Sequence, residues 1–368
     1  MGRGLTQKIW LCTFFIVGMG LVTLYSASYQ NLRVEHEVFY DQLACAVVGF
    51  FLMLIMSRID YRRFFDIAYV FYGLSVVLLV FVLFSGRHAL GAQRWFVLGG
   101  ISFQPSEIAK LGLILALGRY FSQNRSAISF SFVNMPYIVM RDLMVPLMMT
   151  GVPMLLVFKQ PDLGTAILFF GIFIIMLFMS GLEKRFIGGF LGLCLAVLPM
   201  AWHVLKPYQK DRLLVFMNPN IDPLGAGYTI IQSRIAVGSG QVWGKGWLAG
   251  TQNQLNFLPE RHTDFIFSVI GEEWGLVGAL LLLFAYFVLI DSGLRIAEQV
   301  NDKFGVQVTM GIVSILSLQV LINIGMVIGL CPVVGITLPM ISYGRSSFMI
   351  FVFMMGFLLS LSRRRIVF

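Results

Sequence analysis

The chain has 368 residues, of which 58% are hydrophobic and only 12% are charged, and its mean hydropathy is +0.84. This composition excludes an ordinary soluble domain, in which about a quarter of the residues are charged. The formal net charge of +9 raises the question of nucleic acid, but no basic block with interleaved aromatics lies on a soluble element. The composition predicts a membrane protein that does not bind nucleic acid.

Ten apolar segments approach the length of about 20 residues that a helix needs to cross a bilayer. In chain order they lie at about 9–28, 38–57, 67–85, 104–121, 142–158, 164–181, 186–205, 265–290, 306–330 and 346–362. Their apolar runs are continuous, whereas the strands of a transmembrane barrel alternate in polarity. We predict an all-α polytopic membrane protein, with residues 1–368 forming a single integral membrane domain.

The distribution of Lys and Arg predicts the orientation. These residues gather in one set of loops and at both chain ends, and the short loops of the other set hold few of them. The first set is therefore expected to be cytoplasmic, and the long loop at about 206–264 lies outside, between the seventh and eighth spans. The first span is interpreted as an uncleaved signal anchor because nine spans follow it.

Polar residues mark the fourth span and the turn before it. Trp95, in the outer sequence GAQRWF, is either an aromatic-belt residue or a wall for a sugar or lipid. Glu107 and Lys110 are i and i+3 in QPSEIAK and share one helix face, with Gln104 just before the helix start. They form an internal ion pair that lets the span insert, a site facing a polar cavity, or both.

Two further outer segments carry charged residues. Lys159 and Asp162 flank a proline in KQPDLGT, which predicts a short turn with a local ion pair. The long outer loop is rich in Trp, Gly and amide side chains, and residues 230–237 fit a short amphipathic helix at the interface. A loop of this length and aromatic content is expected to be functional rather than disordered.

Asp264 is the leading catalytic candidate, at the point where the outer loop becomes the eighth span. A carboxylate there is partly desolvated, which raises its pKa and makes it a better general base. The alternative is a helix cap, in which Thr263 or Asp264 satisfies free N–H groups. The cations Arg261 and Arg212 either bind a phosphate leaving group or anchor the loop at the membrane interface.

The last spans also contain polar or irregular features. Gln319 and Asn323 are i and i+4 on the ninth span and are expected to bond to a neighbouring helix. Residues 335–347 form a Gly- and Pro-interrupted segment at membrane depth, which is tolerated only when it is buried in protein or lines a cavity. The four cysteines form no CxxC pair and the four histidines no HExxH motif, so neither a disulfide framework nor a structural metal is predicted.

Several motifs together resemble the SEDS family, which includes RodA, FtsW and the sporulation homologues. Between about residues 86 and 347 the chain contains, in the family's order and spacing, GAQRW, FQPSEIAK, KQPDLGTA, GYTIIQSRIAVGSG, GKGWLAGTQNQLNFLPERHTDFIF, GEEWGLVG and the ISYG region. FLPERHTDFIF is long and specific, and KQPDLGT and HTDFIF are more similar to RodA than to FtsW. In one departure, the family's usual SYGG is SYGR here, with Arg345 in place of a glycine that can adopt positive φ.

The resemblance implies a ten-span bacterial inner-membrane peptidoglycan glycosyltransferase of cell elongation. It implies polymerisation of lipid II outside the membrane, with a class B penicillin-binding protein and the elongation machinery as partners. By motif match Asp264 takes the place of the family's essential carboxylate. The residues expected around substrate in its central cavity are Glu107, Lys110, Trp95, Arg94, Gln104, Lys159, Asp162, Arg212, Arg261, His262 and Ser342.

The expected reaction is attack of an acceptor sugar hydroxyl on a lipid-diphosphate-linked chain, with Asp264 as the base. A diphosphate substrate is compatible with a Mg²⁺ or Mn²⁺ ion, although no all-protein cage is visible in the sequence. The alternatives are a lipid II flippase, to which intramembrane polar residues are suited, and a non-catalytic scaffold for wall synthesis.

Overall fold

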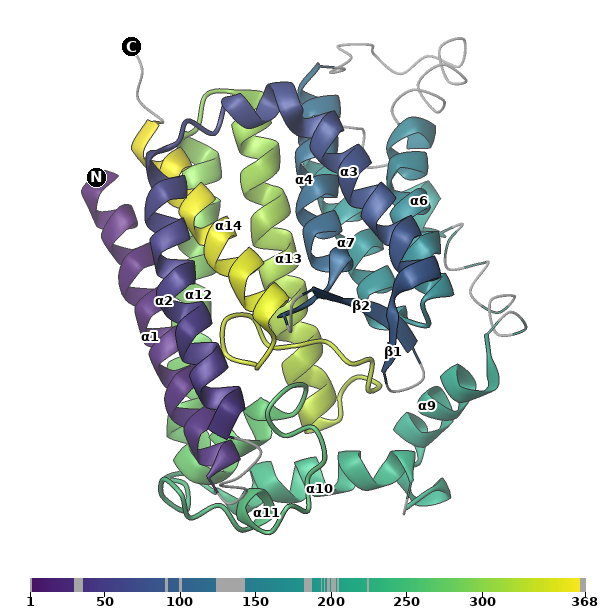
Figure 1. The fold of residues 1–368 in the computed structure, drawn as a ribbon, viewed down its shortest axis with the longest axis vertical. Coiled ribbons are helices and arrows are strands. Elements are labelled where there is room, and N and C mark those ends of the chain that lie inside the picture. Colours follow the sequence, from purple (N-terminus) through teal and green to yellow (C-terminus); the bar gives the residue numbers. More distant parts are fainter. Residues whose placement is uncertain are drawn as a thin grey trace.

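A computed structural model describes residues 2–29, 36–89, 92–98, 101–123, 143–181, 187–192, 205–223 and 225–364, together with positions 194, 196, 199 and 203. The fold is a bundle of long helices, with the two termini at one end and helices α10 and α11 at the other (Figure 1). The bundle helices are α1 (Gly2–Ser28), α2 (His36–Arg58), α3 (Arg63–Ser85), α4 (Pro105–Gln123), α6 (Val145–Lys159), α7 (Leu163–Met179), α12 (Ile266–Gln299), α13 (Lys303–Ile328) and α14 (Arg345–Arg364).

These nine helices overlap nine of the ten expected ranges. The remaining range, 186–205, is described only in part, and its described positions other than 205 are helical. Within the described part of the chain, α1, α2, α3, α12, α13 and α14 are long and apolar enough to cross a membrane, and α6 and α7 are shorter apolar helices. The predicted all-α membrane class is confirmed. Helix α4 is almost wholly buried despite its charged residues, so neighbouring helices, rather than lipid, surround it.

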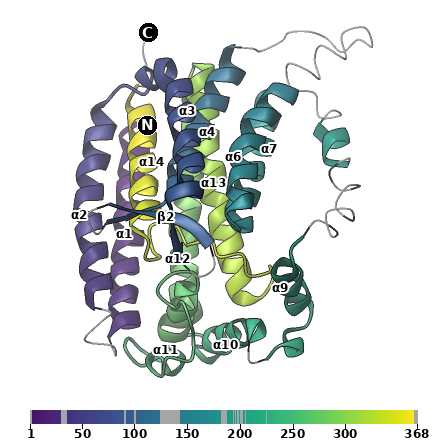
Figure 2. The same ribbon diagram turned by 45° about the vertical axis from the view of Figure 1, so that its right-hand side comes forward.

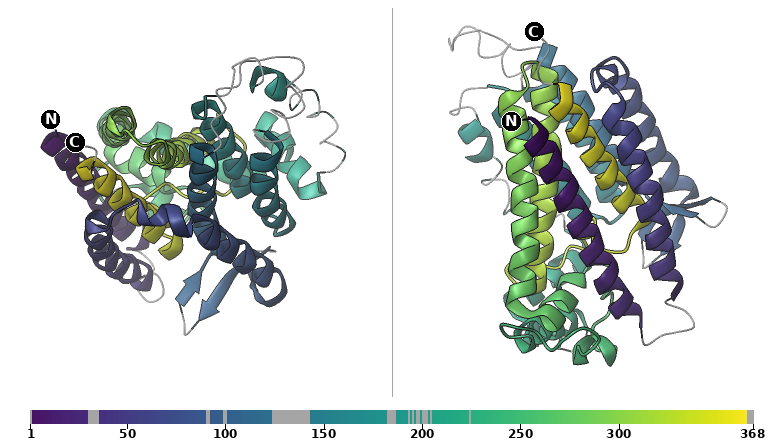
Figure 3. Two further views of the ribbon diagram at one scale, coloured as in Figure 1. Left: turned by 90° about the horizontal axis from the view of Figure 1, so that it is seen from above. Right: turned by 90° about the vertical axis from the view of Figure 1, so that its left-hand side faces the viewer.

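The centre of the bundle is formed by α4, α13 and α14, while α2 and α3 lie at its edge (Figures 1 and 3). Helix α13 packs against α12, α4 and α7, and α14 packs along α2. From another direction, α1, α2 and α14 form one side of the bundle and α6 and α7 the other (Figure 2). This arrangement encloses the segment between α13 and α14, which carries much of the candidate site.

A small antiparallel sheet in the order β1-β2-β3 was not expected from the sequence. It consists of β1 (Arg87–Ala89), β2 (Ala92–Leu98) and β3 (Ile101–Phe103). Strand β2 packs against α3 and α4, and the ring of Phe96 stacks on that of Phe81 at 5.5 Å between centroids. Strand β2 therefore holds Arg94 and Trp95 at a defined place beside α3 and α4.

The long loop predicted at 206–264 folds into a cap over the end of the bundle opposite the termini (Figure 1). It contains α9 (Pro207–Met217), a 3₁₀ turn (Pro219–Ile221), α10 (Ala226–Ser239) and α11 (Thr251–Gln254). Helix α10 includes the predicted amphipathic segment 230–237 and packs against α12 and α13. The described part of the cap thus packs onto the bundle through α10.

Helix α12 is broken at Gly275, whose φ of 63° and ψ of −159° interrupt the helix. The cap supplies hydrogen-bond partners for the backbone groups that the break leaves unpaired: Lys245 and Gly246 donate their N–H groups to the carbonyls of Glu272 and Glu273. On the other side of the break, the N–H groups of Leu276 and Val277 donate to carbonyls of the same cap segment. No Cβ fits at Gly275, because it would lie 2.3 Å from the nitrogen of Gly244. The cap segment 241–246 and the N-terminal part of α12 are therefore one hydrogen-bonded unit.

Candidate active site

Asp264 lies immediately before α12 and is partly exposed to solvent. The helix begins at Ile266 with Phe265 as its N-cap residue, and no side chain caps it. The capping alternative for Thr263 and Asp264 is therefore wrong. Among the described residues, no hydrogen bond reaches the Asp264 carboxylate, and Gly335 approaches it closely enough that a Cβ there would lie 3.4 Å from Oδ2.

The backbone around Asp264 is held firmly, although its side chain is open. Tyr343 donates its N–H to the carbonyl of His262 at 2.9 Å, and the Ser342 hydroxyl donates to the carbonyl of Thr263 at 2.6 Å. The Asn323 amide donates to the carbonyl of Asp264 itself at 2.9 Å. Ser342 therefore lies beside the backbone that carries Asp264, and the carbonyl of His262, two residues earlier, is held by the same segment.

Burial raises the pKa of Asp264 from 3.8 to about 7. The carboxylates of Glu260 and Asp162 raise the pKa further, while Arg212 and Arg94 lower it. Charged groups from the cap, from α9, from β2 and from the turn between α6 and α7 are therefore near enough to shift the pKa of this one carboxyl. A carboxyl with a pKa near neutrality is suited to general base catalysis, because it accepts a proton readily and is still substantially ionised at neutral pH.

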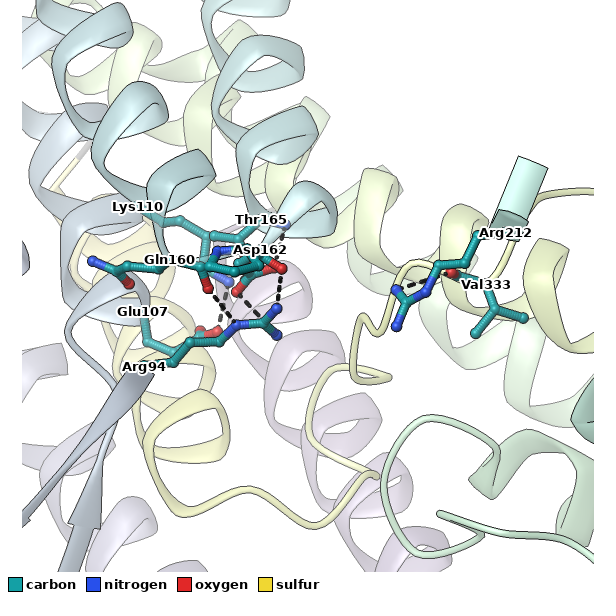
Figure 4. A network of polar contacts seen from close by, with 9 residues as sticks. Arg94, Glu107, Lys110, Gln160, Asp162, Thr165, Arg212 and Val333 are labelled. Atoms are coloured by element: carbon teal, nitrogen blue, oxygen red, sulfur yellow. Dashed lines mark hydrogen bonds and ion pairs between the residues drawn. The ribbon is translucent and has the colours of Figure 1, made fainter. Parts of the chain in front are cut away.

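A polar cluster lies where β2 meets the turn between α6 and α7 (Figure 4). Arg94 donates from Nε to the carbonyl of Gln160 at 3.0 Å and also to the carbonyl of Pro161. Its guanidinium lies 3.9 Å from the Asp162 carboxylate, which accepts hydrogen bonds from the backbone and hydroxyl of Thr165. The predicted ion pair between Lys159 and Asp162 is wrong: Asp162 pairs with Arg94, and Lys159 is exposed.

Glu107 and Lys110 form the predicted internal ion pair near this cluster, with 2.8 Å between Nζ and Oε1 (Figure 4). Both side chains are buried, and the second oxygen of Glu107 has no partner among the described residues. Gln104, just before α4, donates its backbone N–H to the hydroxyl oxygen of Ser346 at 2.9 Å, which joins the start of α4 to α14. Trp95 is half-buried on β2.

The remaining predicted cations differ in their surroundings. Arg212 on α9 is exposed and donates to the carbonyl of Val333 at 3.3 Å, across from the Arg94 cluster (Figure 4). Arg261 is 5% exposed and donates to the carbonyl of Ala27 at 2.8 Å and to Asn256, so it ties the cap to α1. These contacts hold Arg261 inside the protein, between the cap and α1, rather than at the membrane interface, and Arg212 is the more exposed of the two.

The sequence did not predict two side-chain pairings near the candidate site. Asn323 was expected to bond to a neighbouring helix, but its partners are the carbonyls of Asp264 and Ile336. Asp41 on α2 pairs with Arg345, which is the first residue of α14. Arg345 is not among the positive-φ residues of the described chain, so the unusual SYGR sequence imposes no left-handed backbone here. Only the tertiary fold reveals either pairing.

Within the described residues, no group of three His, Cys, Asp or Glu side chains comes together in a way that would hold a metal ion. The fold and the site define a membrane protein in which a partly exposed carboxyl with a raised pKa, acted on by two arginines, lies beside a bundle of apolar helices. Comparison with known proteins identifies the family.

Residues 6–366 match the sequence profile of the FtsW, RodA and SpoVE proteins, described as cell cycle proteins. The chain belongs to this family, the SEDS family, and is a multi-pass membrane protein. It is 43% identical over 346 residues to the peptidoglycan glycosyltransferase MrdB of Escherichia coli K12, covering 94% of this chain and 90% of the relative.

Two solved structures resemble the whole chain. A chain of a peptidoglycan synthase complex that coordinates polymerization and crosslinking has a TM-score of 0.80 at 32% identity, with 97% of each chain covered. The RodA protein of Thermus thermophilus has a TM-score of 0.70 at 31% identity, with 97% of this chain and 96% of that one covered.

Proposed function

We propose that this chain is a peptidoglycan glycosyltransferase that polymerises lipid II into β-1,4 glycan strands, with Asp264 as its catalytic base. The observation that carries the proposal is an open carboxyl group on a fixed backbone, with a pKa of about 7. The similarity to MrdB over nearly the whole chain supports the same reaction class and a role in cell elongation and shape.

In the proposed reaction, the 4-hydroxyl of the acceptor sugar attacks the anomeric carbon of the lipid-linked donor. A new C–O bond forms on one face while the bond to the lipid diphosphate breaks on the other, so the α-linked donor gives a β-linked product. Asp264 takes the hydroxyl proton as the bond forms. The charge that develops on the departing diphosphate requires fixed cations nearby.

Arg94 and Arg212 are the cations best placed for this task, because both act on the charge of Asp264 from different elements. Arg94 is oriented by two backbone carbonyls and by Asp162, so its guanidinium is already positioned before substrate arrives. Glu107 and Lys110 hold groups in place rather than perform the chemistry, and Trp95 provides an aromatic wall. Lys159, Gln104 and His262 complete the proposed substrate surroundings. A divalent cation would be bound chiefly through the substrate diphosphate, since Mg²⁺ commonly takes few protein ligands.

We also propose that both termini are cytoplasmic and that the cap is outside. In support, the ends of α1 and α14 share one end of the bundle with the turn between α2 and α3, where Arg58, Arg62 and Arg63 lie (Figure 1). Reporter fusions at each terminus and within the cap should give opposite signals, and equal signals would contradict this orientation.

A class B penicillin-binding protein is the proposed partner, supported by the similarity to a synthase complex chain.

The test uses purified protein with its penicillin-binding partner and labelled lipid II in detergent. Native protein should produce glycan polymer, and Asp264→Asn should produce none while expressing normally. Asp291→Asn is a matched control, because this carboxylate pairs with exposed Arg295 near the other end of α12. Polymer from Asp264→Asn at the native rate would refute the base assignment. Absence of polymer from native protein, with lipid II crossing liposome bilayers instead, would favour a flippase.

A further inference from the structure

Three consecutive carbonyls, those of His262, Thr263 and Asp264, each accept a hydrogen bond from a different donor. The donors are the Tyr343 N–H, the Ser342 hydroxyl and the Asn323 amide. Ordinary loops satisfy most such groups with water or with local turns. Here all three bonds come from α13 and from the segment between α13 and α14, which are about 60–80 residues away in the chain.

Asn323 holds the central position in this arrangement. It is completely buried in α13, and its single amide nitrogen donates both to the Asp264 carbonyl at 2.9 Å and to the Ile336 carbonyl at 2.7 Å. One side chain therefore fastens the residue bearing the carboxyl group to the segment that lies against that group at Gly335. Ser342 reinforces the same joint, because its hydroxyl accepts from Leu338 N–H while donating to Thr263.

We propose that Asn323 is a positioning residue for catalysis, with Ser342 as its second anchor, and that together they fix the backbone from which the Asp264 carboxyl projects. This inference rests on the proposed function. Asn323 does not touch substrate in this scheme, and it acts through Asp264. A general base is effective only within hydrogen-bond reach of the proton it removes, and misplacement by about 1 Å can cost about a hundredfold in rate.

A purely structural amide would behave differently. Its loss would reduce the amount of folded protein without changing how each folded molecule responds to pH. If Asn323 fixes Asp264, its loss lets the carboxyl turn toward water, and weaker desolvation brings its pKa down toward the ordinary value. The groups that face Asp264 and stay in place are Glu260 in the cap, Asp162 at the N-cap of α7, Arg212 on α9 and Arg94 on β2.

The experiment compares Asn323→Ala with Gln319→Ala, using the full chain with labelled lipid II and rates normalised to folded protein. Gln319 is 1% exposed and lies one turn earlier on α13, but makes no hydrogen bond to residues 262–264. Asn323→Ala should lower kcat by about 30-fold with KM changed by less than about twofold, and should move the acidic limb of the pH profile down by about half a unit or more. Gln319→Ala should leave both close to native.

Asn323→Gln, which keeps an amide on a longer side chain, should recover part of the loss. A kcat for Asn323→Ala within about twofold of Gln319→Ala, with an unmoved acidic limb, would overturn the proposal. If Asn323→Ala does not fold, Ser342→Ala decides by the same two readouts, and a native rate and pH midpoint would overturn it. Native protein and Asp264→Asn are measured in parallel, so that inactivity of native protein counts against the proposed function and not against this inference.

Discussion

Asp264 and Glu272 lie eight residues apart at the same end of α12, and their surroundings are opposite. The Glu272 carboxylate is fully buried and accepts hydrogen bonds from Lys245, the Thr251 hydroxyl and the backbone N–H groups of Gln252 and Asn253. The carboxylate of Asp264 accepts none from the described residues, while its backbone is clamped from outside. A saturated carboxylate has no capacity left for substrate, whereas an open one on a fixed backbone is available for chemistry.

The largest expected effect separates the two residues by rate. Asp264→Asn should lower the rate of polymerisation per folded molecule by about a thousandfold, the range in which general bases contribute. Glu272→Gln should change it by less than about threefold, because this residue is remote from the proposed proton transfer. Initial rates with labelled lipid II, normalised to folded protein, test both. Similar losses in the two variants would remove the distinction.

Stability should show the reverse order. Glu272→Ala leaves Lys245 and the start of α11 without their acceptor, and should cost about 3 kcal/mol in free energy of unfolding. Asp264→Ala removes no hydrogen bond to the carboxylate and should cost less than about 1 kcal/mol. Denaturant or thermal unfolding in detergent measures the two, and a larger loss for Asp264→Ala would contradict the assignment of roles.

The pH dependence of stability gives a smaller effect with a definite sign. Because burial raises the pKa of Asp264 to about 7, the fold disfavours the ionised form. This destabilisation is absent below the ordinary pKa, grows as the pH rises, and is complete above about 7. Since the side chain is partly exposed, we expect about 1 kcal/mol. Asp264→Asn should therefore raise the Tm by a few degrees at pH 8 but hardly at pH 4, and the opposite trend would refute the raised pKa.

The smallest expected effect on stability concerns Arg345, where the segment between α13 and α14 ends and α14 begins. Arg345 pairs with Asp41, and both side chains are partly exposed. Such pairs contribute less than about 1 kcal/mol. Arg345→Gly, which restores the family's usual sequence, should therefore be nearly neutral for stability. A double-mutant cycle with Asp41→Asn measures the coupling energy of the pair directly. A coupling of several kcal/mol would contradict this expectation and would show that the Asp41–Arg345 pair, like the hydrogen bonds of Asn323, holds the segment between α13 and α14 in place.

Much of the fold was predictable because apolar runs of about 20 residues report membrane helices directly. The short strands β1 to β3 were missed, since they alternate poorly and owe their pairing to packing on α3 and α4. Asp264 could be singled out from its place at a span boundary and from family resemblance. The pairings around it could not: Asn323 with Asp264 and Arg94 with Asp162 each join residues about 60 to 70 positions apart, and sequence spacing carries no information at that range.

The break in α12 at Gly275 makes this helix depend on the cap. In a bilayer, backbone groups left unpaired by a broken helix need partners, and here the partners are residues 241–246 of the cap. A chain whose cap is unfolded would therefore leave the backbone on both sides of Gly275 without these partners, so damage to the cap reaches the N-terminal part of α12 as well.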